Sequence, residues 1–213
     1  MFRSISILIA FTAVLCLGCV LPCLAVAAAP DQAAVDKAFD ALKTFQWGQE
    51  RKTLVPIEEA VMASPKDAAA QKALEARLAA VLKTDAPRAA KDFVCRQLSY
   101  IGSAESVPVL AALLPDKDLS HMARVALEPL PDPAADEALR AALGTAKGRL
   151  LVGVIVSLGV RRDAKAVDAL AKLLGDADAD LAQGAARALG TIGTPAAADA
   201  LEAALPKTPA ANQ

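Results

Sequence analysis

Histidine and cysteine, on which most metal centres and many nucleophilic sites depend, are scarce in this chain. Of its 213 residues one is histidine, His121, and four are cysteine. A single histidine cannot supply the paired ligands of a His-Glu-x-x-His zinc helix. The sequence also lacks a Cys-x-x-Cys-His haem attachment motif, a glycine-rich phosphate loop and a Gly-x-Ser-x-Gly nucleophile turn. We therefore expect no catalytic residues, no metal site and no cofactor.

An excess of charge of one sign is missing as well. The chain carries 23 basic and 24 acidic residues and a formal net charge of -1. No overall field therefore attracts nucleic acid or anionic lipid, and we expect no nucleic-acid partner. Aromatic residues make up only 3% of the chain, whereas 55% is hydrophobic and much of that share is alanine. This composition favours closely packed helices and predicts one elongated all-α domain.

The first 27 residues differ from the rest of the chain. Arg3 precedes an almost uninterrupted apolar run, which ends in the small-x-small sequence Ala25, Val26, Ala27 that signal peptidases accept. We interpret residues 1–27 as a signal peptide, which predicts a periplasmic or secreted protein. Two alternatives stay open. Residues 5–29 are long enough to span a bilayer if uncut, and Cys19 lies in a weak lipoprotein-like box, so the membrane is a partner only if this segment is retained or lipidated.

Export would leave the mature chain with one cysteine. Cys16, Cys19 and Cys23 lie in the predicted signal, so only Cys95 remains and no internal disulfide can form. Cys95 is either a reactive thiol or, as free cysteines commonly are, a small apolar filler of the core.

Self-similarity predicts the fold. Leucine recurs in two columns, each with steps of 29, 31 and 31 residues: Leu98, Leu127, Leu158 and Leu189, and then Leu110, Leu139, Leu170 and Leu201. A third column with the same steps holds Val94, Ala123, Val154 and Ala185. Glycine or proline breaks each unit into two helices, and apolar residues recur at three and four after each break. Such a pair buries its apolar stripe only by stacking on its neighbours, which predicts an all-α solenoid.

The predicted solenoid consists of about five stacked antiparallel helix pairs. Residues 28–83 form an N-terminal capping helix and a divergent pair, residues 84–206 form four repeats, and residues 207–213 form a disordered tail. Phe39, Phe45 and Trp47 gather where the stack begins. We interpret them as part of a cap, because terminal repeats need a distinct outer face; a ligand-stacking cluster is the alternative.

The segments "AARALGTIGTPAAADALEAAL", "ESVPVLAALL" and "DAKAVDALAKLL" resemble HEAT repeats of the short bacterial, phycobilisome-lyase type. The resemblance covers residues 86–205 well and 31–83 loosely. It implies a scaffold whose second helices line a concave binding face. Deoxyhypusine hydroxylases share this architecture but need several His-Glu pairs for a di-iron centre, which one histidine excludes. A bilin-lyase-like enzyme remains a minor alternative, because that chemistry leaves no clear motif.

His121 lies in a first helix, in a column shared with Asp92, Val152 and Gln183. Because side chains of very different polarity share this column, we expect His121 to be a solvent-facing residue. A metal ligand or general base is the alternative, but no second ligand lies at helical spacing.

Two groups of residues are candidates for interaction. Glu137, Asp168 and Asp199 share one register of three successive second helices and predict a carboxylate ladder that would prefer a basic partner; a solvated face is the alternative. Leu151, Val152 and Ile155 make one first helix apolar nearly all round. They form either a patch for a partner or a second copy, or core covered by the stems of neighbouring arginines.

Together these features predict an exported, non-catalytic protein-interaction scaffold with a protein partner and possible self-association. An accessory subunit of an envelope enzyme complex is the alternative function.

Overall fold

A computed structural model describes residues 31–207 of the chain. These residues form helices and connecting turns, with no strand among them, which confirms the predicted all-α class. The predicted signal (residues 1–27) and most of the predicted tail (residues 208–213) lie outside the described residues. Within residues 31–207, no helix is both long enough and apolar enough to cross a bilayer.

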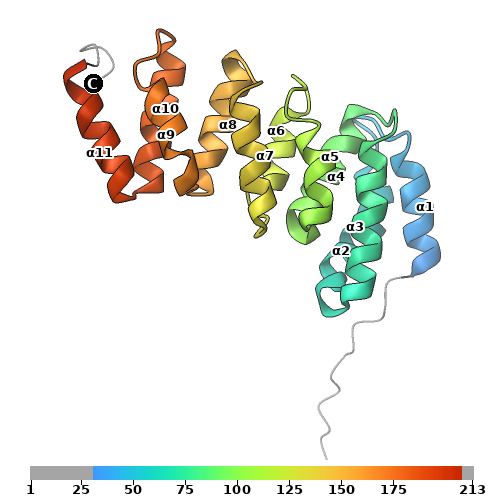
Figure 1. The fold of residues 1–213 in the computed structure, drawn as a ribbon. Helices are drawn as coiled ribbons and strands as arrows, with labels where there is room; N and C mark the ends of the chain where they lie inside the picture. Colours follow the sequence, from blue (N-terminus) through green and yellow to red (C-terminus); the bar gives the residue numbers. More distant parts are fainter. Residues whose placement is uncertain (1–30, 208–213) are drawn as a thin grey trace, which may run out of the picture.

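Eleven α-helices follow one another along the described residues and form an elongated row (Figure 1). They are α1 (Gln32–Leu42), α2 (Val55–Ala63), α3 (Ala68–Leu82), α4 (Arg88–Ile101), α5 (Val107–Ala111), α6 (Ser120–Leu127), α7 (Pro133–Leu143), α8 (Gly148–Val160), α9 (Val167–Leu173), α10 (Ala179–Ile192) and α11 (Pro195–Ala204). Short 3-10 turns join them: η1 (Arg51–Leu54), η2 (Ser64–Lys66), η3 (Ala104–Ser106), η4 (Ala164–Ala166) and η5 (Leu205–Lys207).

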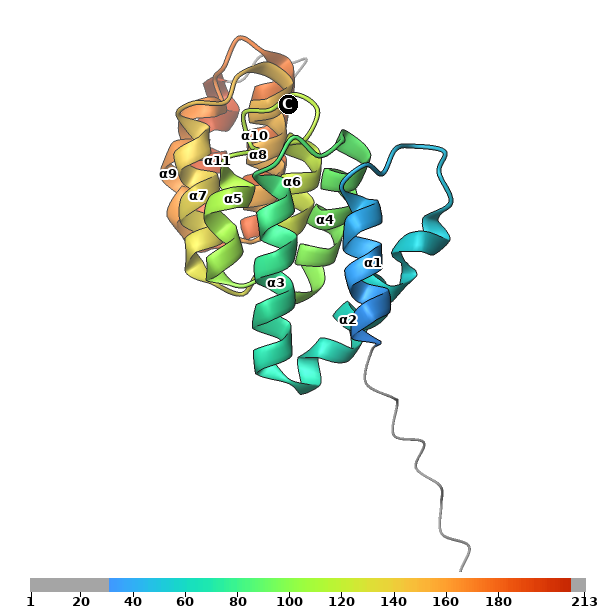
Figure 2. The ribbon, with the colours of Figure 1, turned by 90° about the vertical axis from the view of Figure 1, so that its right-hand side faces the viewer.

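The four repeats form two layers of helices. Seen along the row, α4, α6, α8 and α10 lie on one side, and α5, α7 and α9 on the other (Figure 2). Each first helix packs against the first helix of the next repeat, and each of α3, α5, α7 and α9 packs against the first helix that follows it. The helices therefore stack in pairs, as the repeat period predicted.

The leucine columns form the centre of the stack. Leu98, Leu127, Leu158 and Leu189 are fully buried between the layers. In the second column Leu110, Leu139 and Leu170 are fully buried, but Leu201 is only half-buried. Leu201 lies on α11, the last α-helix of the described residues, so no further repeat covers it there. The periodic sequence signal therefore corresponds to burial wherever a neighbouring repeat is present.

The N-terminal end of the row is closed by α1. This helix begins at its N-cap Asp31, whose side chain accepts a hydrogen bond from Ala33 N–H, and it buries Phe39 against the stack. The guanidinium of Arg77 in α3 lies over the Phe39 ring, 4.0 Å from its centroid. Phe45 is also buried, but Trp47 is 66% exposed. Two of the three gathered aromatic residues are therefore part of the cap, and the third faces solvent.

The first helices α8 and α10 approach each other closely. A Cβ added at Gly159 would lie 2.9 Å from the Cα of Ala188, so any side chain there would force the two helices apart. Glycine and alanine at this crossing let the backbones approach closely. This approach buries the side of α8 that carries Ile155.

Candidate interaction surfaces

The second helices begin at a column of side-chain caps. Ser103, Asp132, Asp163 and Thr194 follow the same steps of 29, 31 and 31 residues as the leucines, and each accepts a hydrogen bond from a backbone N–H two or three residues later. Such caps satisfy backbone donors that the first turn of a helix leaves unpaired. The sequence pattern could have predicted this column, because four residues of capping type share the period of the leucine columns, but it was not identified there.

Glu75 is a buried carboxylate in α3 that serves the fold. Its Oε1 accepts hydrogen bonds from Ser103 N–H at 2.6 Å, from the Ser103 hydroxyl at 2.9 Å and from the Ser106 hydroxyl. These donors belong to the turn between α4 and α5. Because three donors converge on it, Glu75 fixes that turn against α3.

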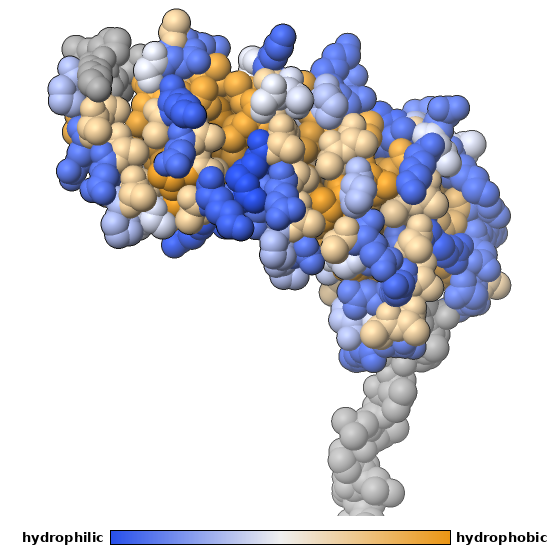
Figure 3. All heavy atoms as spheres, in the orientation of Figure 1, coloured by the Kyte–Doolittle hydropathy of each residue, from blue (hydrophilic) through white to orange (hydrophobic). Residues whose placement is uncertain are grey.

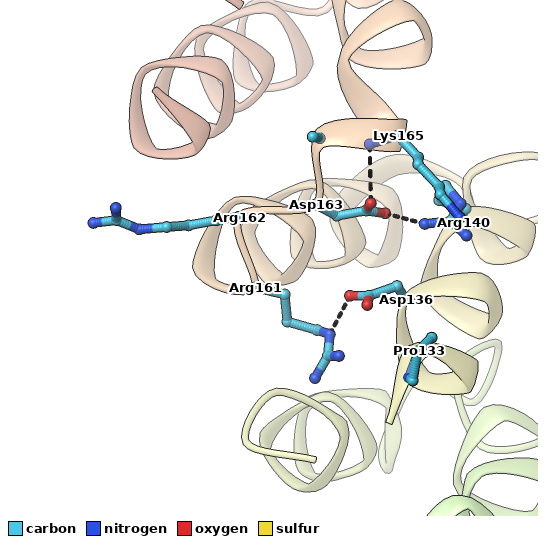
Figure 4. A pocket seen from close by; sticks show the side chains of 8 residues that line it. Pro133, Asp136, Arg140, Arg161, Arg162, Asp163 and Lys165 are labelled. Carbon is cyan, nitrogen blue, oxygen red and sulfur yellow. Dashed lines mark hydrogen bonds and ion pairs between the residues drawn. The ribbon is translucent and has the colours of Figure 1, made fainter. Parts of the chain in front are cut away.

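Arg161 ties the third repeat to the second. It is the C-cap residue of α8, and its side chain is only 7% exposed. Its Nη1 donates to the carbonyl oxygens of Leu127, Glu128 and Leu130 at 2.8, 3.0 and 2.6 Å. Its Nε also pairs with Asp136 in α7 (Figure 4). These carbonyls lie at and just beyond the C-terminus of α6, where helices leave acceptors unpaired. Arg161 therefore caps a helix of the preceding repeat.

A hollow of about 320 Å³ lies beside the Arg161 side chain, between α7 and the turn that follows α8. In it Arg140 pairs with Asp163, the same residue that caps η4 (Figure 4). Arg162 points away from the hollow, and Lys165 lies at its edge (Figure 4). The two carboxylates that line the hollow, Asp136 and Asp163, both pair with arginines, so the hollow lies at a contact between repeats.

Arg124 fills the space between α6 and α8. Its Nη1 donates to the carbonyl oxygen of Gly153 at 3.1 Å and to the hydroxyl of Ser157 at 3.2 Å. That hydroxyl donates in turn to Glu128 at 2.7 Å. Burial lowers the pKa of Arg124, with Glu128 acting in the opposite direction. The group is a polar joint between two repeats.

The two interpretations of the apolar residues on α8 differ in whether these residues are buried. Ile155 is fully buried, and Leu151 and Val152 are half-buried against the core. The burial of Ile155 fits the core interpretation of this group and not the patch interpretation. The cause is the close approach of α10: a Cβ added at Gly184 would lie 3.7 Å from Ile155 Cγ2 and 3.8 Å from Val152 Cγ1. Ile155 therefore belongs to the core between α8 and α10.

His121 is exposed on α6, as expected from its column. Its Nδ1 lies 3.5 Å from Arg124 Nη2, a cation that would oppose binding of a metal ion. Among residues 31–207, no three His, Cys, Asp or Glu side chains come together as a metal site would require.

Cys95 and Asp92 lie one turn apart on α4. Cys95 is fully buried, and burial raises the pKa of its thiol to about 12. The thiol therefore stays protonated at neutral pH, as the filler interpretation expects. Burial also raises the pKa of Asp92, although Arg88, whose Nε lies 3.9 Å from its Oδ2, lowers it in part. The other oxygen, Oδ1, is buried without a hydrogen-bond partner.

Glu137, Asp168 and Asp199 are exposed on α7, α9 and α11. None of the three forms an ion pair within the described residues. In Figure 3, which views the layer of second helices, hydrophilic side chains project from an apolar background along the row. The three carboxylates are therefore free to meet a partner.

A comparison with known protein families matches the C-terminal part of the chain. Residues 137–212 match the family described as HEAT repeats, and this segment begins within α7 and includes the last two helix pairs. The match and the paired helices support a HEAT-repeat protein, a class of helical scaffolds that is generally non-catalytic and commonly mediates protein–protein contacts. No curated protein matches the chain.

Proposed function

We propose that this chain is an exported, non-catalytic scaffold whose second-helix layer holds a basic protein partner. The observation that carries the proposal is the exposure of Glu137, Asp168 and Asp199 in one register, without an ion pair among the described residues. Carboxylates that the fold needed would accept hydrogen bonds or form ion pairs within the protein, as Glu75 and Asp163 do. Three unpaired carboxylates on successive second helices instead offer complementary charge to lysine or arginine.

The buried polar groups of the repeats support the scaffold interpretation. Arg161, Arg124 and Glu75 each join one repeat to the next through hydrogen bonds. Joints of this kind hold the spacing of the repeats, so that a partner meets a preformed surface and loses less entropy on binding. Export rests on the apolar N-terminal segment alone and is part of the proposal.

The test is affinity capture from an envelope fraction with the tagged mature chain. The variant Glu137→Lys, Asp168→Lys, Asp199→Lys should lose the captured partner, because each substitution turns attraction into repulsion. The matched control reverses three exposed acidic residues outside these second helices, Glu50, Glu59 and Asp85. It changes the net charge by the same amount and should retain the partner. Equal capture by both folded variants would refute the role of the carboxylates.

A further inference from the structure

The outward side of the first helices carries apolar residues that the fold leaves uncovered. Among residues 31–207 the large exposed hydrophobic side chains include Tyr100 on α4 (64% exposed) and Val156 and Val160 on α8 (45% and 54%). Tyr100 and Val160 are two repeats apart in one column, and Pro129 lies between them with the steps of 29 and 31 residues. Pro129 is exposed as well.

A second column runs beside the first, one helical turn earlier. It holds Arg96, Val125, Val156 and Arg187, of which Val125 is half-buried and the others are exposed. Since α4, α6, α8 and α10 pack successively against one another, the two columns lie side by side across the layer. We call Tyr100, Val125, Pro129, Val156 and Val160 the outer strip.

Three arginines on the first helices flank the outer strip in its columns or on its helices. Arg96 precedes Tyr100 by one turn on α4, Arg187 occupies the same column on α10, and Arg149 precedes Val152 and Val156 on α8. All three are exposed, and none has an acidic group within 4.0 Å among the described residues. Arg88, the first residue of α4, by contrast pairs with Asp118. An apolar centre with unpaired positive charge at its ends requires an occupant of the complementary kind.

From this arrangement we infer that the outer strip docks an amphipathic segment of a partner protein, with aliphatic or aromatic side chains along its centre and acidic residues beside them. Five residues, four on α4, α6 and α8 and one in the turn after α6, are too few for a standard interface between globular surfaces, which uses roughly 20 to 30 residues a side. They match one helix instead, because the four first helices from α4 to α10, with axes ~10 Å apart, span ~30 Å, the length of about 20 helical residues. The chain's net charge of -1 gives no general attraction to an anionic bilayer, so the arginines act locally.

The outer strip is a separate surface from the carboxylates of the second helices. The first and second helices form opposite layers (Figure 2), so the two surfaces can be occupied together and tested independently. Loss of binding at one of them has no bearing on the other.

The experiment uses two fluorescent peptides of about 18 residues with the same leucine face, one flanked by glutamates and the other by lysines. Fluorescence anisotropy with residues 28–213 should show at least about tenfold tighter binding of the glutamate peptide at low salt, a difference that falls as salt rises. Arg96→Glu with Arg187→Glu should abolish this preference.

The apolar part is tested with Val156→Ser and Val160→Ser together, which should weaken binding of the glutamate peptide about tenfold, since burial of two valines is lost. Should this variant lose its helical signal, Val156→Thr with Val160→Thr keeps the side-chain shape and replaces it. The control Met62→Ser alters a residue that is 71% exposed on α2 and should bind unchanged.

Equal binding of the two peptides, or no effect of the valine substitutions, would overturn the inference. So would binding only to vesicles rich in phosphatidylglycerol, which would indicate a membrane. Self-association that the valine substitutions abolish, without peptide binding, would instead assign the strip to a second copy of the chain.

Discussion

The guanidinium of Arg124 in α6 occupies the space that a side chain at Gly153 in α8 would need. A Cβ added at Gly153 would lie 2.6 Å from Arg124 Cζ and 2.7 Å from its Nη2. The same guanidinium donates to the carbonyl oxygen of Gly153. The two residues therefore form one joint between repeats, in which the absence of a side chain on α8 makes room for a long one on α6.

Gly153→Ala should destabilise the protein by about 1 kcal/mol at most, because the added methyl group displaces the guanidinium from its hydrogen bonds, while the flexible arginine can move aside and alanine is the better helix former. In the background of Arg124→Ala the same substitution should stabilise the protein by about 0.5 to 1 kcal/mol, since alanine is the better helix former. Urea denaturation of the four proteins of this cycle measures both effects. Destabilisation of equal size in both backgrounds would show that Arg124 is not the obstacle.

Arg161→Met should lower the free energy of unfolding by about 2 to 4 kcal/mol. Methionine keeps the apolar stem but leaves the carbonyls at the end of α6 and the carboxylate of Asp136 without their donor. Arg162→Met, at the neighbouring exposed arginine, is the control and should stay within about 0.5 kcal/mol of the parent. Similar unfolding midpoints for both variants would contradict the capping role.

Leu158→Ala should destabilise by about 2 to 5 kcal/mol, because Leu158 is fully buried in the middle of the leucine column. Val160→Ala, two residues later on the exposed side of α8, should change stability by no more than about 0.5 kcal/mol. Thermal and urea unfolding followed by circular dichroism compare the two. A small effect of Leu158→Ala would mean that the repeats do not stack through this column.

Asp92→Asn should stabilise the protein at neutral pH and have little effect in acid. Burial raises the pKa of this carboxyl above its usual 3.8, so its protonated form is favoured in the folded state. Its contribution to stability is complete below the pKa of the unfolded chain and is lost as pH rises through the folded-state pKa. Asparagine avoids that loss, by on the order of 1 kcal/mol at neutral pH. Urea denaturation from acid to neutral pH measures the free energy of unfolding of both proteins. A variant that is less stable than the parent at neutral pH would refute the prediction.

The native protein should begin near Ala28, because the sequence Ala25, Val26, Ala27 fits the small-x-small specificity of signal peptidase. Mass spectrometry of the intact protein from its own cells makes the measurement. A terminus at Met1, or a diacylglyceryl group on Cys19, would show that the segment is retained or lipidated.

Much of the architecture was predictable because it depends on local and periodic signals. The columns of Leu98 and Leu110 mark helices that bury one face, and glycine or proline marks the break between the two helices of each unit. These predictions needed only the chain's own period and the known preferences of helix ends. His121 is exposed as predicted, but Asp92 and Val152 of the same column are buried and half-buried, so the column alone does not decide exposure.

The sequence by itself determined that helices of this period must stack, because their apolar stripes have no other place to be buried. Only the tertiary structure decided which side of each first helix is covered. Ile155 is buried because Gly159 and Gly184 let α10 approach closely, whereas Val156, the next residue, faces solvent. The distance between two helices depends on the residues of both at their crossing, and a pattern along one helix does not contain it.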